Sequence, residues 1–257
     1  ADVLAGIMGP TIAVAGKILR RPAWVFYDTE FAKATNRWVY PLANKVITPD
    51  CYHGEVGRNH VSYPGYHELA YLHPERFTPD PNRVRAAGID PDLPFTVVRF
   101  VGWWATHDRG EVGLSSEQKI RAVRELQQFG RVVISSESAV PAELEEFVYR
   151  GPVEDIHHTL AFAALYVGES ATMASECAVL GTPAIYVATT GRGYTDDQAT
   201  YGLVHDYRDT QFEEAVRTST GLLENLADTR SNALQARRQL LANRIDVTAH
   251  MIDLFET

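Results

Sequence analysis

The chain has 257 residues, 45% hydrophobic and 22% charged, which is the composition of an ordinary folded protein long enough for one large domain or two modest ones. No stretch approaches 18 uninterrupted apolar residues, so no membrane-spanning helix is predicted. The formal net charge of −9 argues against a general nucleic-acid-binding protein, although a helix N-terminus with one or two arginines can still hold a phosphate.

Short apolar runs alternate with helical patterns along almost the whole chain, which is typical of parallel sheets crossed by helices. The predicted strands are 3–5, 23–27, 45–48, 61–63, 95–101, 131–135, 165–167 and 184–187. The predicted helices are 11–19, 31–42, 68–72, 116–129, 155–163, 172–180 and one long C-terminal helix from about 229 to 254.

The two ends of the chain and its middle suggest a domain organisation. The chain opens on a strand-like run without an initiator Met or a signal-peptide pattern, so we expect a first domain truncated at its N-terminus, residues 1–78. Prolines and aspartates between 79 and 94 indicate a linker. Residues 95–228 are expected to form a second Rossmann-like domain, and residues 229–257 a C-terminal helix that could return to the first domain.

A weak internal repeat supports two similar halves. In each half a glycine turn leads into a helix, and an X-Pro-Ala step opens the next strand, at 21–23 and at 182–184. All βαβ units share some of this pattern, so the repeat is only suggestive. A doubly wound α/β sheet binds its ligand at the carboxyl ends of its strands.

The segment from 165 to 185 carries the clearest chemical pattern. A short apolar strand ends at a glycine, and small residues then open a helix whose first N–H groups lack partners within the helix and lie at the positive end of its dipole. We therefore predict a diphosphate-binding turn formed by Gly168, Glu169, Ser170, Ala171 and Thr172.

Glu176 follows Thr172 by one turn on the same face of the predicted helix, where its carboxylate could accept hydrogen bonds from the two ribose hydroxyls of a nucleotide. The alternative interpretation is purely structural. In it, Ser170 only caps the helix and Glu176 is a solvated helix residue.

This segment resembles the C-terminal-domain signature of the GT-B nucleotide-sugar superfamily, particularly the non-hydrolysing UDP-N-acetylglucosamine 2-epimerases. Their pattern is Asp-Ser-Gly-Gly, three residues, Glu-Ala, and then Leu-Gly-Lys-Pro. Here 169–172 stand at the first four positions, Glu176-Cys177 at the Glu-Ala, and 180–183 at the closing motif. The resemblance implies a GT-B-like α/β fold, with two doubly wound parallel-sheet domains facing a cleft. It also implies a diphosphate-binding role for Ser170, Ala171 and Thr172 and a ribose-binding role for Glu176.

Along its whole length the chain is similar to domain-of-unknown-function family three-five-four of archaea and bacteria, usually grouped with GT-B proteins. The phrases that carry this similarity are 26–30, 63–68 and 191–196. Members of that family are longer at the N-terminus.

The resemblance to the epimerases fails at acidic positions that their elimination chemistry requires. The turn at 5–10 has no acid, and residues 33–35 provide none before the Asn36-Arg37 pair. Glycosyl transfer requires fewer groups, so we favour a glycosyltransferase over an epimerase. A nucleotide-binding module without catalysis is the third alternative.

Three residues are candidate catalytic bases. Asp28 and Glu30 follow a predicted strand at the carboxyl edge of the first sheet, and Asp28 is also a good helix cap. His107, beside Asp108, lies in the loop after strand 95–101.

Two arginines are candidates for contacting the phosphates. Arg99 projects from an otherwise apolar strand and requires either a carboxylate partner or a ligand phosphate. Arg192 lies in a glycine-rich loop after strand 184–187, at the same sheet edge as the diphosphate turn. A plain flexible loop is the alternative there.

The remaining expectations concern ligands and setting. A nucleoside diphosphate of the UDP type is expected as part of the substrate, and the sequence contains no firm indication of a separate cofactor. Cys51 and Cys177 lack metal-ligand spacing, and His157-His158 lack a third ligand, so we predict no metal site. Two cysteines in dissimilar surroundings suggest a reducing compartment, so we also predict a cytoplasmic location. The sequence leaves monomer and homodimer open.

Overall fold

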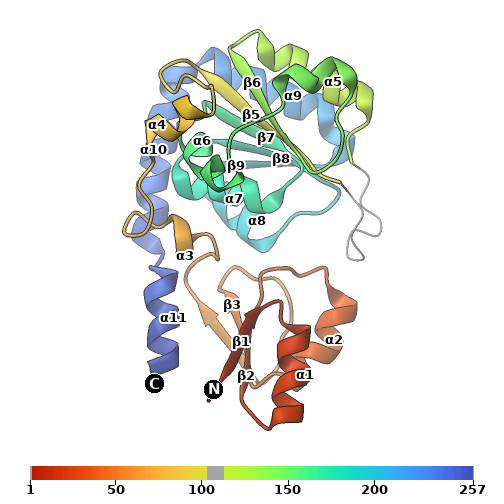
Figure 1. The fold of residues 1–257 in the computed structure, drawn as a ribbon, viewed down its shortest axis with the longest axis vertical. Coiled ribbons are helices and arrows are strands. Elements are labelled where there is room, and N and C mark those ends of the chain that lie inside the picture. The colour runs from red at the N-terminus through yellow and green to blue at the C-terminus, as the bar shows by residue number, and fades with distance from the viewer. Residues whose placement is uncertain (1, 103–112, 257) are drawn as a thin grey trace. The chain divides into compact units, whose positions relative to one another are not determined.

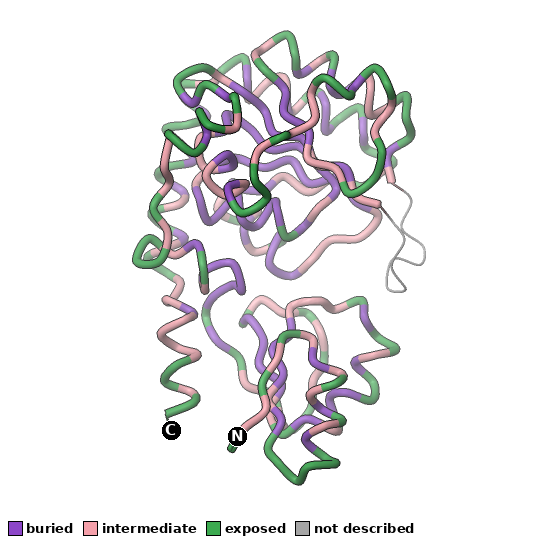
Figure 2. The backbone as a smooth tube through the Cα atoms, in the orientation of Figure 1, coloured by how far each residue is buried: buried purple, intermediate pink, exposed green. Residues whose placement is uncertain are grey.

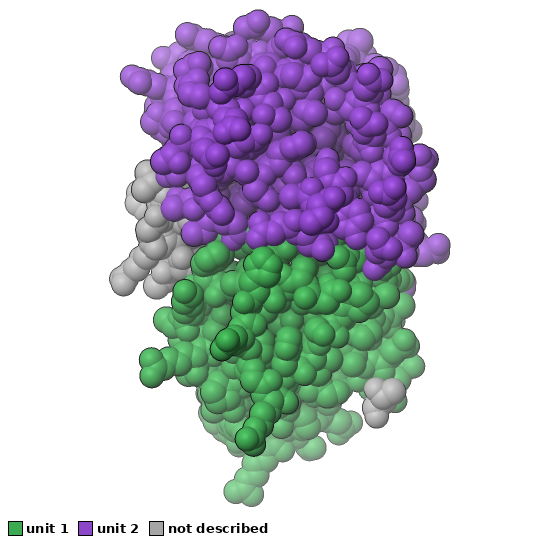
Figure 3. Space-filling view, turned by 180° about the vertical axis from the view of Figure 1, so that it is seen from behind, with its two compact units in different colours: residues 1–70, 192–194, 244–257 green, residues 71–191, 195–243 purple. Residues whose placement is uncertain are grey.

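The computed structural model describes residues 2–102 and 113–256, in which parallel strands alternate with helices (Figure 1). Contacts divide the chain into two compact units, coloured separately in Figure 3. Unit 1 comprises residues 1–70, 192–194 and 244–257, and unit 2 comprises residues 71–191 and 195–243. Across the described ranges, no helix combines the length and the apolar character that crossing a bilayer requires.

Unit 1 contains a four-stranded parallel sheet in the order β1-β2-β3-β4. Its strands are β1 (Leu4–Ile7), β2 (Ala23–Phe26), β3 (Lys45–Pro49) and β4 (His60–Tyr63), and its helices include α1 (Pro10–Leu19), α2 (Lys33–Leu42) and α11 (Val247–Glu256). Buried apolar side chains of β2, β3 and the two first helices form its core, including Ala13, Val25, Val39 and Val46.

Unit 2 contains a five-stranded parallel sheet in the order β6-β5-β7-β8-β9. Its strands are β5 (Phe95–Phe100), β6 (Arg131–Ser136), β7 (Leu165–Gly168), β8 (Ala184–Val187) and β9 (Val204–Tyr207). The helices along this part of the chain are α3 (Leu69–Leu72), α4 (Pro81–Ala86), α5 (Ser116–Gln127), α6 (Ile156–Phe162), α7 (Ala171–Leu180), α8 (Gly193–Thr200), α9 (Phe212–Glu224) and α10 (Leu226–Asn243). The central strands are buried, as Figure 2 shows in purple, which explains their continuous apolar runs.

Helix α7 is buried along nearly its whole length, because it packs between the sheet and helices α6 and α10. It ends at Gly181, whose φ of 88° lies in the left-handed region that favours glycine. The Arg237 side chain donates a 2.8 Å hydrogen bond from Nε to the Val179 carbonyl near that end. The position of α7 is therefore fixed at its C-terminus.

The single C-terminal helix expected from 229 to 254 is two helices, α10 and α11. The break lies at Arg244 and Ile245. The Ile245 N–H donates to the carbonyl of Pro64 (3.0 Å), and Arg244 Nη1 binds both carboxylate oxygens of Asp50 at 2.9 and 3.0 Å. The bond from the Ile245 N–H takes the place of one that a continuous helix would make, and the Arg244 ion pair holds the chain beside it, both within unit 1.

Four further parts of the chain differ from the expectation or add to it. The glycine-rich segment expected as a loop becomes helix α8 from Gly193, and β9 and α9 were not predicted. Segment 79–94, expected as a linker, contains α4, and its Val84 and Ile89 side chains are buried. Arg83 of α4 forms an ion pair with Asp155 at 2.5 Å. The segment is therefore a packed part of unit 2.

Candidate functional site

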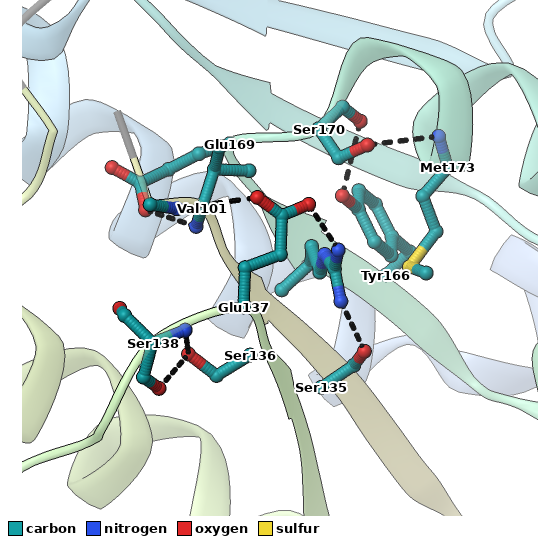
Figure 4. A network of polar contacts seen from close by, with 11 residues as sticks. Val101, Ser135, Ser136, Glu137, Ser138, Tyr166, Glu169, Ser170 and Met173 are labelled. Atoms are coloured by element: carbon teal, nitrogen blue, oxygen red, sulfur yellow. Dashed lines mark hydrogen bonds and ion pairs between the residues drawn. The ribbon is translucent and has the colours of Figure 1, made fainter. Parts of the chain in front are cut away.

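The turn between β7 and α7 forms a helix N-terminus. Ser170 is the N-cap, and its Oγ accepts a hydrogen bond from Met173 N (3.3 Å), while the Tyr166 hydroxyl donates to the Ser170 carbonyl (3.1 Å) (Figure 4). The N–H groups of Ala171 and Thr172, at the first helical positions, have no acceptor within the helix. They lie at the positive end of the helix dipole, which favours an anion.

Gly168 has a packing reason to be glycine. A Cβ placed there would lie 2.7 Å from the backbone oxygen of Arg99 and 2.7 Å from the Tyr166 hydroxyl. A glycine is therefore required here because the backbone lies close to strand β5 and to the Tyr166 side chain, which holds the turn.

Glu169 is only 3% exposed, and its carboxylate binds backbone rather than facing outward. Its Oε2 accepts from Val101 N at 3.1 Å (Figure 4). Its Oε1 accepts from Leu114 N at 2.7 Å. These two residues flank the sequence 103–112. Glu169 thus ties two separate stretches of backbone to the start of α7.

Arg99 has the carboxylate partner that was one of its two expected alternatives. Its guanidinium donates to Ser135 Oγ (2.6 Å) and forms an ion pair with Glu137, which comes from the loop after β6 (Figure 4). Glu137 also accepts from Gly102 N at 3.4 Å. The Arg99 side chain is thus held beside the turn by Ser135 of the neighbouring strand β6 and by Glu137 just after that strand.

Glu176 is buried, with 7% of its surface exposed, so the solvated alternative is wrong. Its Oε1 accepts a hydrogen bond from the Tyr71 hydroxyl and contacts Nε2 of His157, both at 2.9 Å. The rings of Tyr71 and His157 lie 5.4 Å apart. Both contacts use Oε1, and within the described ranges no residue binds Oε2. One carboxylate oxygen is therefore held in place while the other has no partner in that part of the chain.

Sequence reasoning missed Tyr71 and His157. His157 was considered only as a metal ligand, and Tyr71 lies in a short helix far from Glu176 along the chain. They are separated from Glu176 by 105 and 19 positions respectively, so no local spacing could connect them.

Asp28 in unit 1 forms a buried pair with His67. Asp28 Oδ2 lies 3.0 Å from Nδ1 of His67, and Asp28 Oδ1 accepts from the Thr29 hydroxyl (2.9 Å). Burial opposes ionisation of Asp28, but the hydrogen bond and charge of His67 outweigh it and lower the pKa of this carboxyl. Burial likewise opposes protonation of His67, and Asp28 outweighs it and raises the pKa of the imidazole.

The other nitrogen of His67, Nε2, is buried and has no hydrogen-bond partner in the described part of the chain. The pair is therefore a histidine whose orientation is fixed by a carboxylate and whose second nitrogen is uncommitted. His67 was not predicted as a site residue, and the only signal for it is the Tyr-Pro-Gly-Tyr-His-Glu phrase at 63–68.

Glu30 lies in a different set of contacts within unit 1. Its Oε1 accepts from Gly193 N (3.0 Å) and from His53 N (3.4 Å). The guanidinium of Arg192 lies 4.5 Å from the ring centroid of Phe31. The structure thus places Arg192 with Glu30 and Phe31 in unit 1.

His107 lies outside the described residues. Over residues 2–102 and 113–256, no three His, Cys, Asp or Glu side chains gather closely enough to hold a metal ion.

No protein-family model matches the chain, and no curated protein matches it. Several solved structures share its fold. A putative UDP-N-acetylglucosamine 2-epimerase from Listeria monocytogenes aligns with a TM-score of 0.61 and 11% identity, over 91% of this chain and 68% of that one. Spinosyn forosaminyltransferase SpnP aligns with a TM-score of 0.60 and 14% identity, over 100% and 76%. The S. aureus MnaA–UDP complex aligns with a TM-score of 0.59 and 12% identity, over 90% and 69%.

These likenesses confirm the expected fold class, a GT-B-like fold with two α/β domains that each contain a parallel sheet. The identities are too low to select among the activities that those structures represent.

Proposed function

We propose that unit 2 binds the nucleoside diphosphate of a nucleotide sugar. In this proposal the N–H groups of Ala171 and Thr172, which have no acceptor within the helix, donate to the diphosphate, and the Glu176 carboxylate accepts from the ribose hydroxyls. The observation that carries the proposal is Glu176, a buried carboxylate with one oxygen held by Tyr71 and His157 and the other without a partner among the described residues.

The spacing of the two groups fits one ligand. Glu176 lies four residues after Thr172 in α7, which is about 6 Å along the helix axis on the same face. Ribose hydroxyls are donors, and a hydrogen bond from a hydroxyl to a carboxylate is stronger than one between neutral groups. The S. aureus MnaA structure, which shares this fold, is a complex with UDP, a ligand of this kind.

Calorimetric titration of the full chain with UDP, GDP, CDP and ADP tests the proposal. At least one of them is expected to bind, and Glu176→Gln is expected to weaken that binding at least tenfold, about 1.4 kcal/mol. Glu224→Gln, an exposed change at the end of α9, is the matched control and is expected to bind normally. Equal binding by both variants, or no binding of any nucleotide by the parent chain, would refute the site.

We further propose glycosyl transfer in preference to epimerisation. The Asp28–His67 pair provides the base that transfer to a hydroxyl requires. In such a transfer a base takes the proton of the acceptor hydroxyl while the hydroxyl oxygen bonds to the anomeric carbon, and the bond from that carbon to the diphosphate breaks with its electron pair left on the phosphate oxygen. His67 is the candidate for this base because Asp28 orients its imidazole and its Nε2 has no partner among the described residues.

Epimerisation through elimination is less well supported by the same residues. It needs a base near C2 of the sugar and further acids, and the turn at 5–10 and the start of α2 at 33–35 contain none.

Two assays separate the alternatives once the nucleotide is known. Transfer predicts nucleoside diphosphate release that depends on an added acceptor and falls at least a hundredfold in His67→Ala. Epimerisation predicts incorporation of solvent deuterium at C2 of UDP-N-acetylglucosamine. Binding without either reaction across a broad acceptor panel would instead indicate a non-catalytic module.

A further inference from the structure

Unit 1 contains an open pocket of about 620 Å³ that none of the groups assigned above to the nucleotide lines. Residues along α2, from Lys33 to Pro41, form one wall, and the loop after β3 forms the other. A pocket of this size accommodates a small polar metabolite.

Two cations on one helix face line this pocket. Lys33 and Arg37 are four residues apart in α2, so they lie on the same side of the helix. Both side chains are exposed, and neither forms an ion pair with any residue that the structure describes. They offer charge and hydrogen-bond donors to an anion.

Two residues that line the same pocket each carry a buried acceptor atom without a donor among the described residues. Asn36, which is 7% exposed, has no partner for its Oδ1 among the described residues, and Glu30 has none for its buried Oε2. The other carboxylate oxygen of Glu30, Oε1, accepts hydrogen bonds from the backbone N–H groups of Gly193 and His53. A buried acceptor without a donor costs about 1–3 kcal/mol, and a ligand hydroxyl would recover that cost.

Two tyrosines and an exposed glutamate also line the pocket. The hydroxyls of Tyr40 and Tyr52 lie 2.6 Å apart. Burial and the contact with Tyr40 raise the pKa of Tyr52 far above its ordinary value, so both phenols stay protonated. Glu55 is exposed, so its charge is better screened than that of Glu30.

We infer that this pocket binds a small hydroxylated anion, such as a sugar phosphate or a sugar acid. Its anionic group would pair with Lys33 and Arg37, and its hydroxyls would donate to Glu30 and Asn36. The inference concerns unit 1 and does not depend on the nucleotide site.

The test titrates the full chain with glucose 6-phosphate and gluconate, and with glucose and inorganic phosphate as probes that carry only one of the two features. Saturable binding of a hydroxylated anion, at least tenfold tighter than either single-feature probe, is expected. Lack of saturable binding, or inorganic phosphate binding as tightly as glucose 6-phosphate, would overturn the inference.

Variants assign the binding to these residues. The double variant Lys33→Ala/Arg37→Ala is expected to lose at least tenfold in affinity, and Glu30→Gln, which keeps the side-chain shape, at least threefold. Lys17→Ala on α1 is the matched control, because Lys17 is an exposed lysine of unit 1 outside the pocket. Unchanged binding by the double variant, with its fold verified by circular dichroism, would remove the assignment.

The two proposals fail separately. Glu176→Gln is expected to impair UDP binding and leave glucose 6-phosphate binding unchanged, whereas the Lys33/Arg37 double variant is expected to do the reverse. Parallel loss of both ligands in one variant would contradict the inference of an independent site.

Discussion

Tyr71 and Glu176 lie 105 positions apart in the sequence, and the Tyr71 hydroxyl donates a 2.9 Å hydrogen bond to Oε1 of Glu176. His157 contacts the same oxygen, so the carboxylate is held by two side chains from other elements. A buried carboxylate is costly unless hydrogen bonds satisfy it. Tyr71 and His157 meet part of that requirement and fix the direction in which Oε2 faces.

Removing the Tyr71 hydroxyl tests this positioning role. Tyr71→Phe is expected to lower the free energy of unfolding by about 1–2 kcal/mol, because a charged acceptor loses one donor. It is also expected to weaken UDP binding by a few-fold while leaving the specificity among nucleotides unchanged. Thermal denaturation and calorimetry measure the two effects. The control is Tyr149→Phe, whose hydroxyl donates to the Pro152 carbonyl at an exposed site. Equal effects of the two changes on UDP binding would contradict the role.

The Asp28–His67 pair predicts a pH dependence of stability. The pKa of His67 is raised in the folded chain, so its contribution is complete below about 6.5 and is lost as pH rises through the folded value. The pKa of Asp28 is lowered, so its contribution is present above 3.8 and is lost as pH falls through the folded value. The stability difference between the parent chain and Asp28→Asn is therefore expected to be largest between about pH 4 and 6.5.

Urea denaturation at several pH values measures this difference, and NMR titration of His67 provides an independent readout. In Asp28→Asn the pKa of His67 is expected to fall, since the partner that raised it is gone. A His67 titration that does not change in the variant would show that the pair is not coupled.

Asp206 in β9 predicts that stability falls as pH rises, which is opposite to the trend that Asp28 produces. Burial, assisted by the nearby charge of Asp196, raises the pKa of Asp206 to about 6, from 3.8. The folded chain then holds a proton that the unfolded chain has lost, so stability falls as pH rises from about 4 to about 6. Asp206→Asn is expected to flatten the melting temperature over that range. Asp228→Asn, an exposed change in α10, is expected to leave the slope as it is, and an unaltered slope in Asp206→Asn would count against the explanation.

Gly168 predicts a steric effect on stability. In Gly168→Ala the new Cβ meets the Arg99 carbonyl at 2.7 Å, and strand β5 cannot move away without disturbing the sheet. A loss of about 1–3 kcal/mol in the free energy of unfolding is expected. The matched control is Gly221→Ala in α9, where a Cβ meets nothing within 4 Å. That change is expected to be neutral or to stabilise by up to about 1 kcal/mol. Similar melting temperatures for the two variants would rule out the steric account.

The fold class and the element types around the β7–α7 turn follow from local sequence patterns. Apolar runs such as Phe95–Phe100 and Leu165–Gly168 reveal buried strands because parallel strands need apolar residues on both faces. The N-cap Ser170 and the glycine at 181 mark the two ends of α7 through local backbone chemistry. These signals lie within a few residues of the features that they determine.

The roles of the charged groups depend instead on tertiary packing. Glu169 binds the backbone at Val101 and Leu114, Arg99 pairs with Glu137, and Asp28 pairs with His67. The break between α10 and α11 depends in the same way on Asp50 and Pro64. Hydrogen bonds of this kind join residues tens of positions apart, and a helix or strand pattern contains no information about which distant donor will reach a given carboxylate. The sequence could therefore locate the turn at Ser170, whereas the uncommitted oxygen of Glu176 and the buried Nε2 of His67 emerged only from the packing around them.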